Sequence, residues 1–265
     1  MKKKHVLVVE DYDLNQDLLE LQLQEMGCVV FIANNGVEAV EYCNKESIEL
    51  VFMDINMPIM NGCEAAKKIR ESESKCKNVP IIAMSANADK EIEGNCRSCG
   101  MNDIVIKPVG KRVLSEILER WLSDDKQSDT ISSVVSVSLK KVCDQNVQDK
   151  DIYLNYEKAL EEFCGNVVLL NNSLKSFLIN VDNQIVPVKK AILDNDLEFV
   201  KLQMHKISGA AANLTAVSLS KLAAVLENMA EAQTASFEDL NISFLEFEKF
   251  YIDFKEHVVH MNKNK

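Results

Sequence analysis

The sequence predicts two folded units of different class, a doubly wound α/β unit with a five-stranded parallel sheet and an all-α four-helix bundle. Two observations indicate this division. Short apolar runs alternate with helical patterns over residues 1–124, whereas after residue 151 apolar positions recur only at helical spacing. The chain has 265 residues, 47% of them hydrophobic, which is enough to build two such units.

The first unit is marked by five short runs with the composition of buried strands. They are apolar along nearly their whole length, which is typical of parallel strands covered by helices on both faces. Helical patterns separate and follow them, as a doubly wound sheet requires. The strand-like runs are 5–9, 28–33, 50–54, 79–85 and 103–106, and the helical patterns cover about 13–26, 36–45, 62–72, 88–98 and 110–122.

The second unit follows a polar segment, 125–150, whose Ser, Asp, Gln and Lys residues show no sustained period and indicate a linker. Within it, SVVSVSLKKV is compatible with a short strand or a short helix. Residues 151–265 predict a four-helix bundle with a leading helix. We expect Pro187 to kink or break the second long helix. The predicted helices cover 152–163, 166–193, 196–214, 217–232 and 240–260.

Composition excludes several classes of function. The net charge is −11, and Lys plus Arg number 15 against 21 Asp plus Glu in residues 1–124, and 15 against 20 in 125–265. Neither half has the basic excess that nucleic-acid binding needs. No apolar run approaches the roughly 18–20 residues of a membrane span, and carboxylates follow the basic start too soon for a signal peptide. With eight cysteines in no framework-like pattern, a cytoplasmic protein with reduced thiols is predicted.

Polar side chains stand at the carboxyl ends of four predicted strands. Glu10 and Asp11 follow the first strand, Asp54 closes the third, Ser85 the fourth and Lys107 the fifth. Because ligands bind at the carboxyl edge of an open parallel sheet, we expect these side chains to converge there. Three carboxylates in one pocket repel each other and need a cation, and oxygen ligands suit Mg²⁺.

This set of residues predicts phosphoryl transfer. Two carboxylates and the backbone carbonyl of Asn56 can hold Mg²⁺, while Asp54 can attack phosphorus and form an aspartyl-phosphate. The transferred group carries charge on its equatorial oxygens. The ammonium of Lys107, the hydroxyl of Ser85 and Mg²⁺ can each bind one of them.

Residues 1–122 resemble a response-regulator receiver domain through VVEDYDLN, MDINMPIMNG, MSANA and IKP. The resemblance implies a flavodoxin-like fold that catalyses its own phosphorylation from a phosphohistidine donor. The site that it implies consists of the phosphoacceptor Asp54, the metal-site acids Asp11 (direct) and Glu10 (mainly through water), the switch hydroxyl of Ser85 and the essential Lys107.

The segment MHKISGAAANL places His205 on a predicted helix beside small residues only. The opposite stripe of that helix has core spacing. We therefore expect the imidazole on the solvent side, above a clearing that is open to a large, flat partner. The clearing consists of Ser208, Gly209 and Ala212, and the core stripe consists of Met204, Ile207, Ala211 and Leu214.

The segment LQMHKISGAAANL also resembles the phosphohistidine helix of a histidine phosphotransfer (HPt) domain, which would cover roughly 151–260. The resemblance implies that His205 exchanges a phosphoryl group with a receiver aspartate, which a neutral imidazole can do without further activation. Two positions depart from the family patterns. Ser208 replaces the common lysine, for which Lys201 on the same face could substitute, and Ile104 replaces the receiver's usual Tyr or Phe.

Together these features predict a phosphorelay protein between a sensor histidine kinase and a downstream response regulator, and not itself an enzyme of the kinase class. No ATP-binding glycine loop, kinase domain or DNA-binding helix-turn-helix is apparent. A flexible linker of this length reaches about 25–30 Å, which leaves transfer within one chain open. Three alternatives stay open: a docking scaffold with a silent histidine, the carboxyl-terminal piece of a hybrid histidine kinase, against which the initial Met argues, and an Mg²⁺-dependent phosphatase acting through Asp54.

Three further patterns are assigned to structure. Cys96 and Cys99 have the spacing of a zinc or redox pair, but without a second pair they indicate packing or idle thiols. His257 and His260 are expected on a polar helical tail rather than on a metal. An aromatic stripe at helical spacing is assigned to the bundle core, and it consists of Phe244, Phe247, Phe250, Tyr251 and Phe254.

Overall fold

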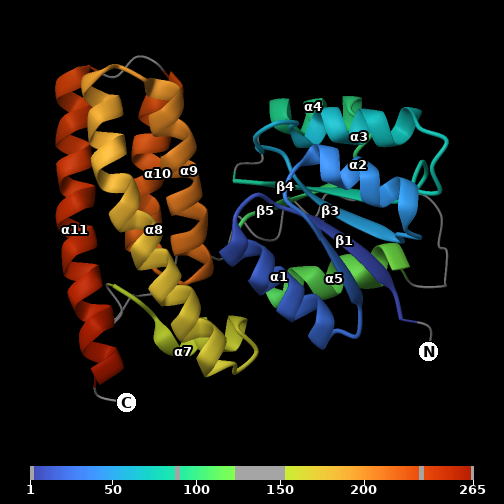
Figure 1. Cartoon of the computed structure of the whole chain (residues 1–265), viewed down its shortest axis with the longest axis horizontal. Helices are drawn as coiled ribbons and strands as arrows, with labels where there is room; N and C mark the ends of the chain where they lie inside the picture. Colours follow the sequence, from blue (N-terminus) through green and yellow to red (C-terminus); the bar gives the residue numbers. More distant parts are fainter. Residues whose placement is uncertain (1–2, 87–89, 123–152, 233–235, 264–265) are drawn as a thin grey trace. The chain divides into compact units, whose positions relative to one another are not determined.

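The computed structural model describes residues 3–86, 90–122, 153–232 and 236–263, which belong to two compact units, Met1–Asn146 and Val147–Lys265 (Figure 1). The predicted linker 125–150, with its unassigned SVVSVSLKKV, lies outside the described residues.

The first unit is a five-stranded parallel sheet with strand order β2-β1-β3-β4-β5. The predicted α/β class is confirmed, and each predicted strand is present with its end at the expected residue. The strands are β1 (His5–Val9), β2 (Val29–Ala33), β3 (Leu50–Asp54), β4 (Ile81–Ser85) and β5 (Asp103–Ile106). The helices are α1 (Asp13–Glu25), α2 (Gly36–Lys45), α3 (Gly62–Glu71), α4 (Lys90–Ser98) and α5 (Lys111–Leu122).

Helices cover both faces of this sheet, as Figure 1 shows. Because successive side chains of a strand point to opposite faces, the apolar strands feed two separate cores. Val51 and Met53 of β3 pack in the cluster that α2, α3 and α4 complete, whereas Leu50 and Phe52 pack in the cluster that α1 and α5 complete. This double burial explains why the strands read as unbroken apolar runs.

The order of the strands fixes the place of a ligand site. The chain passes from β1 outward to β2 and then returns to pair β3 with the other side of β1. At such a reversal, the connections leave the carboxyl ends of the two central strands in opposite directions and open a crevice between them. The ends of β1 and β3 form this crevice.

The second unit is a helical bundle, and the predicted all-α class is confirmed. Each of its four long helices packs against two others, so that α8, α9, α10 and α11 form a closed ring. Asn155, Asn166 and Asp196 cap the starts of three helices by accepting a backbone N–H. The bounds are α7 (Tyr156–Glu162), α8 (Val167–Leu193), α9 (Leu197–Asn213), α10 (Val217–Ala232) and α11 (Phe237–Lys263).

Pro187 does not break the second long helix. The alternative of a break at this position is wrong, because α8 runs without interruption from Val167 to Leu193. Packing outweighs the missing hydrogen bond: Val181 precedes the proline and Val188 follows it, and both side chains are buried in the bundle.

Four of the five aromatic residues predicted for the bundle core lie there, whereas Phe250 is only half-buried. Phe244, Phe247, Tyr251 and Phe254 are almost fully buried. The hydroxyl of Tyr251 donates to the carbonyl of Leu178 at 2.8 Å, so that this buried polar atom is satisfied. Among the described helices, none combines the length and the hydropathy that a membrane span needs.

Candidate functional sites

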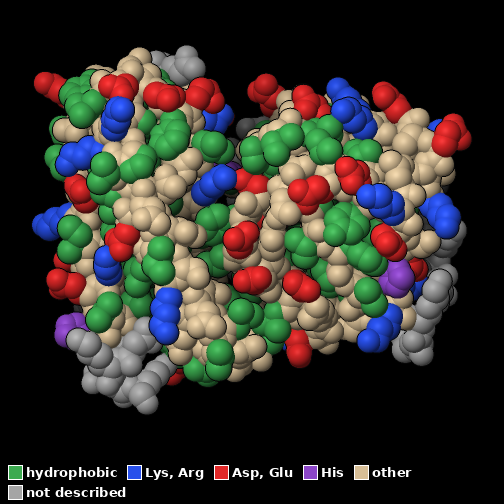
Figure 2. All heavy atoms as spheres, viewed as in Figure 1, with side chains coloured by type: hydrophobic (Ala, Val, Ile, Leu, Met, Phe, Trp, Pro, Cys, Tyr) green, Lys and Arg blue, Asp and Glu red, His purple; other side chains and the backbone are tan. Residues whose placement is uncertain are grey.

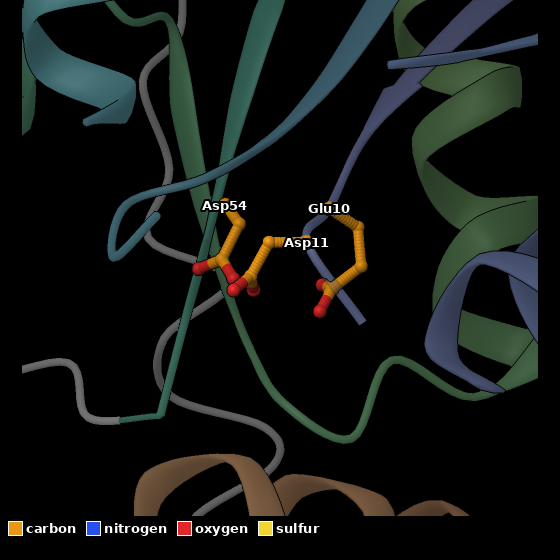
Figure 3. A group of neighbouring side chains, drawn as sticks. All are labelled: Glu10, Asp11 and Asp54. Carbon is orange, nitrogen blue, oxygen red and sulfur yellow. The ribbon is translucent and has the colours of Figure 1, made fainter. Parts of the chain in front are cut away.

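Three carboxylates converge in the crevice between β1 and β3. Glu10 and Asp11 follow β1, Asp54 is the last residue of β3, and one oxygen from each lies within 4.8 Å of the others (Figure 3). Glu10 and Asp54 are 1% and 2% exposed. The convergence expected at this edge of the sheet is therefore present.

Lys107 joins two of these carboxylates. Its Nζ donates to Glu10 Oε2 at 2.6 Å and to Asp54 Oδ2 at 2.7 Å. The lysine side chain is 11% exposed, so both ion pairs are shielded from water. In such a setting the pairs are strongly coupled, and the loss of one partner leaves a costly buried charge.

Burial and neighbouring charge shift two groups of this cluster. Burial, followed by the charge of Asp54, raises the pKa of Glu10 to about 7, although Lys107 acts in the opposite direction. Burial also lowers the pKa of Lys107, but the charges of Asp54 and Glu10 outweigh this effect and raise it above its ordinary value. The lysine therefore stays an ammonium, and Glu10 is the carboxyl that takes up a proton near neutral pH.

Two amides of α1 hold Glu10 in place, and sequence reasoning missed both. Asn15 Nδ2 donates to Glu10 Oε1 at 2.8 Å, and Gln16 Nε2 donates to the Glu10 carbonyl at 2.6 Å. Gln16 also donates to Asn34 Oδ1 at 2.9 Å. The available signal was a pair of adjacent amides in the first turns of a helix directly after the acidic pair.

The loop after β3 lies close against the phosphoacceptor candidate. The N–H of Asn56 donates to Asp54 Oδ1 at 3.2 Å. Gly62, the first residue of α3, packs so tightly on the carbonyl of Asp54 that a Cβ would lie 2.2 Å from its oxygen. A glycine is therefore required at this position, and the start of α3 packs directly against the backbone of Asp54.

The remaining predicted member of the site, Ser85, lies at the end of β4, and Ile104 is the second residue of β5. Ser85 is 5% exposed. Its neighbour on β4, Met84, pairs with Asp54 of β3. The carbonyl of Ser85 accepts the N–H of Lys107 at 2.7 Å. Ile104 of β5 is buried in the core cluster formed with α2, α3 and α4. An aliphatic side chain thus fills the core where the family pattern has an aromatic one.

His205 lies on α9 and pairs with a residue of α10. Its Nδ1 is 2.7 Å from Oε1 of Glu227, and both side chains are only 14% exposed. The expectation of an open imidazole on the solvent side is therefore wrong, because most of the side chain is shielded and Glu227 of α10 lies against it. The predicted core stripe is confirmed: Met204, Ile207, Ala211 and Leu214 are all buried.

A second pair lies one helical turn away on the same two helices. Lys201 Nζ is 2.9 Å from Oε1 of Glu231, and this hydrogen bond, reinforced by nearby glutamates, raises the pKa of Lys201. Ser208 donates to the carbonyl of Ser220 on α10 at 3.1 Å. Ser208, at the position that commonly carries a lysine, therefore links α9 to α10. Lys201 is a cation on the same face of α9 as His205.

Two family models match the chain. The response regulator receiver domain matches residues 6–119, and the Hpt domain matches residues 172–252. The chain is a receiver domain followed by an Hpt domain. Asp54 and its neighbours lie within the receiver match, and both His205 and Glu227 lie within the Hpt match.

Similar proteins include two bacterial sensors. The chain is 26% identical to sensor protein GacS of Pseudomonas syringae pv. syringae over 214 residues, which cover 77% of this chain and 22% of GacS. It is 33% identical to the CAI-1 autoinducer sensor kinase/phosphatase CqsS of Vibrio cholerae over 120 residues, which cover 45% of this chain and 18% of CqsS. The chain thus spans about a fifth of the length of these relatives.

A solved structure matches the receiver half. It is the receiver domain of sensor histidine kinase PA1611 from Pseudomonas aeruginosa PAO1, with a magnesium ion coordinated in its active-site cleft. It is 35% identical to this chain, with a TM-score of 0.43, and the match covers 46% of this chain and 98% of that one.

The donor set of the receiver domain fits a divalent cation. Three carboxylates provide the hard oxygen ligands that Mg²⁺ prefers. When all three are ionised, the single charge of Lys107 leaves two negative charges without compensation, which one divalent ion balances. The contacts of this structure therefore agree with a metal site beside Asp54.

On the face shown in Figure 2, acidic and basic side chains are interspersed on both domains, without a continuous basic patch among the described residues. His257, near the end of α11, packs against Tyr153 with the ring planes tilted and the ring centroids 5.3 Å apart. This contact gives that histidine a packing role.

The cysteines differ from the prediction of reduced thiols. Cys63 and Cys99 form a disulfide, so the assignment of Cys99 to idle or packing thiols is wrong, whereas Cys96 is a buried thiol. Spacing along the chain could not reveal this pair, because its members are 36 residues apart and meet only when α3 and α4 pack on the same face of the sheet.

Proposed function

We propose that the chain is a phosphorelay protein that uses both domains. Asp54 accepts a phosphoryl group from a phosphohistidine donor in the presence of Mg²⁺, and His205 exchanges a phosphoryl group with a receiver aspartate. The proposed partners are a sensor histidine kinase and a downstream response regulator. The observation that carries the proposal is the convergence of Glu10, Asp11 and Lys107 on Asp54.

At the receiver site, the side-chain oxygens of Asp54 are the nucleophile. As the P–N bond of the donor breaks, a P–O bond forms, and negative charge gathers on the phosphoryl oxygens. Lys107 already lies 2.7 Å from Asp54 and can turn its remaining N–H towards the incoming group. Mg²⁺, held by Glu10, Asp11 and Asp54 with the Asn56 carbonyl, would neutralise part of the charge that develops.

At the Hpt site, Glu227 fixes which imidazole nitrogen reacts. An ionised carboxylate can only accept, so Nδ1 of His205 carries the proton that is donated to Glu227. The lone pair is then on Nε2, which attacks phosphorus. The phosphorylated ring is positively charged, and the carboxylate 2.7 Å away stabilises it. Glu227 is thus a positioning residue for phosphoryl transfer.

Lys201 supplies the cation for the phosphohistidine. It lies four residues before His205, on the same face of α9, where its ammonium is 2.9 Å from Glu231. A phosphoryl group on the imidazole can draw the ammonium away from this partly exposed pair, because surface ion pairs contribute little net energy. In this arrangement Lys201 takes the role of the lysine that the family commonly has at the position of Ser208.

A labelling experiment tests the proposal. Wild-type protein, Asp54→Asn and His205→Gln are incubated with a labelled phosphorylated receiver and, separately, with a phosphorylated histidine kinase. Acid lability identifies phosphohistidine, and alkali lability identifies the acyl phosphate. We expect Asp54→Asn to take no label from the kinase and His205→Gln to take none from the receiver. Unchanged labelling of His205→Gln would leave only a scaffold role for the Hpt domain.

A further inference from the structure

The disulfide of the receiver domain connects the start of α3 with the residue that follows α4. Its cysteines have Cα atoms 5.3 Å apart. Cys99 is buried, whereas Cys63 is half-buried and is the member that small molecules in solution reach first. The other cysteines of this domain that the structure describes are buried thiols, namely Cys28, Cys43, Cys76 and Cys96.

Both ends of this cross-link belong to segments that carry the phosphorylation site. Cys63 directly follows Gly62, whose backbone packs on the carbonyl of Asp54. Cys99 lies in the segment between Ser85 and Lys107, the two residues placed to bind the incoming phosphoryl oxygens. The disulfide therefore ties the backbone beside the nucleophile to the segment that connects its two phosphate-binding residues.

Hydrogen bonds, which do not depend on the redox state, join the other end of α3 to the same segment. Arg70, in the last turn of α3, donates to the carbonyl of Gly100 at 2.9 Å and to Asn102 Oδ1 at 2.7 Å. With the disulfide formed, α3 is fixed to residues 99–102 at both ends. With the thiols reduced, the contacts of Arg70 still join α3 to residues 99–102, and the start of α3 can shift relative to Cys99.

We propose that Cys63 and Cys99 are a reversible redox pair that sets how readily Asp54 is phosphorylated, an inference that rests on the proposed function of Asp54. The cross-linked domain accepts a phosphoryl group slowly, because the added group requires the start of α3 and the segment from Ser85 to Lys107 to adjust to each other. Reduction releases one of the two ties and permits this adjustment.

A hydroperoxide is the oxidant class that suits this pair. Reduced Cys63 lies in the first turn of α3, where the helix dipole favours the thiolate. The thiolate attacks one oxygen of hydrogen peroxide, an S–O bond forms, and the O–O bond breaks to release hydroxide, which takes up the proton that the thiol released on ionisation and leaves as the first water. Cys99 then attacks the sulfenic sulfur, an S–S bond forms, and the hydroxide departs with the thiol proton as the second water. A dithiol restores both thiols by exchange.

The coupling must be reciprocal, because the two equilibria share one conformational change. If oxidation disfavours the phosphorylated form, occupation of the phosphorylation site must make the disulfide easier to reduce by the same factor. Beryllium fluoride with Mg²⁺, which mimics an acyl phosphate, allows this to be measured without turnover. This readout depends on the cross-link itself and not on a phosphodonor.

The full chain is treated with hydrogen peroxide or with dithiothreitol, and peptide mass spectrometry locates the disulfide. Asp54 phosphorylation by a small phosphodonor is then timed. We expect the oxidised protein to react about fivefold more slowly, at the lower end of the usual coupling between two sites. Cys63→Ser and Cys99→Ser should react like reduced wild type in both conditions. Cys164→Ser, in the Hpt domain, is the matched control and should keep the redox effect.

The outcomes separate the two proposals. Equal rates in both redox states, or peroxide treatment that leaves Cys63 and Cys99 as thiols, would overturn the redox inference while Asp54 phosphorylation stands. Absence of label on Asp54 in either state would overturn the proposed function and the coupling with it. A rate difference that persists in Cys63→Ser would assign the effect to another group and also overturn the inference.

Discussion

The site around Asp54 is assembled from the ends of four strands and the start of α1, whereas the site around His205 is built from two adjacent helices. In the first, two of the three carboxylates, Glu10 and Asp54, share one buried ammonium, so that their charges depend on each other. In the second, one carboxylate holds one imidazole at the margin of the bundle. Changes at the first site should therefore be larger and more strongly coupled than changes at the second.

The largest effect is expected at Lys107. Lys107→Met removes the charge next to the nucleophile, and we expect Asp54 phosphorylation to slow about 100-fold, as for the loss of one transition-state donor. The change also leaves Glu10 and Asp54 as buried, uncompensated acids, so unfolding should become easier by about 3 kcal/mol at pH 8. Glu10 can relieve this cost by taking up a proton, so the destabilisation should be smaller at pH 6. Lys67→Met, an exposed lysine of α3, is the control.

The second effect concerns the Hpt site alone. Glu227→Gln keeps the size of the side chain but removes its charge and its strict role as an acceptor. Transfer to and from His205 should slow at least about tenfold, because tautomer control and stabilisation of the imidazolium are both lost. Glu231→Gln removes the neighbouring glutamate of α10 that pairs with Lys201 and should change the rate by about twofold or less. Equal effects of the two variants would contradict the positioning role of Glu227.

The third effect is a pH dependence that belongs only to the acidic site. With the pKa of Glu10 near 7, protons compete with Mg²⁺ below neutrality, and affinity should rise about tenfold from pH 6 to pH 8. In the metal-free protein the sign for stability is opposite. The folded state binds the Glu10 proton more tightly than the unfolded state, so this contribution is complete below the ordinary value of 4.5 and is lost as the pH rises through 7. Glu10→Gln should remove both dependences.

The smallest effect is expected at Ser208. Ser208→Ala removes the hydrogen bond to the carbonyl of Ser220 and should lower the free energy of unfolding by about 1 kcal/mol. The transfer rate at His205 should stay within about twofold, because this hydroxyl is bound to α10. A large loss of transfer with unchanged thermal stability would show that Ser208 acts on the phosphoryl group instead.

The sequence predicts those parts of both sites whose signal lies close to the functional side chain. The strands and the acids at their ends were predictable, because unbroken apolar runs mark buried parallel strands and the strand ends must meet at one edge of the sheet. The helix that carries His205 and its buried stripe were predictable from the spacing of apolar residues, whereas the role of His205 stays a prediction from its small neighbours and the family resemblance. In both cases the signal is local, within about ten residues of the functional side chain.

The missed residues depend on contacts between segments. Glu227 meets His205 only through the antiparallel register of α9 and α10, and Cys63 meets Cys99 only through the packing of α3 beside α4. The same register explains why the imidazole is covered rather than open. The alternative of a break at Pro187 failed for a related reason, because buried neighbours on α8 outweigh a local backbone rule.

The most direct test of the account is to titrate wild type and Asp11→Asn with Mg²⁺ at pH 8 and to monitor binding by calorimetry. If the carboxylates that follow β1 and end β3 act as one centre, wild type binds one ion per chain, and Asp11→Asn binds at least about tenfold more weakly because it loses a charged ligand. A wild-type chain without measurable affinity, or an Asp11→Asn chain that binds equally well, would contradict the account.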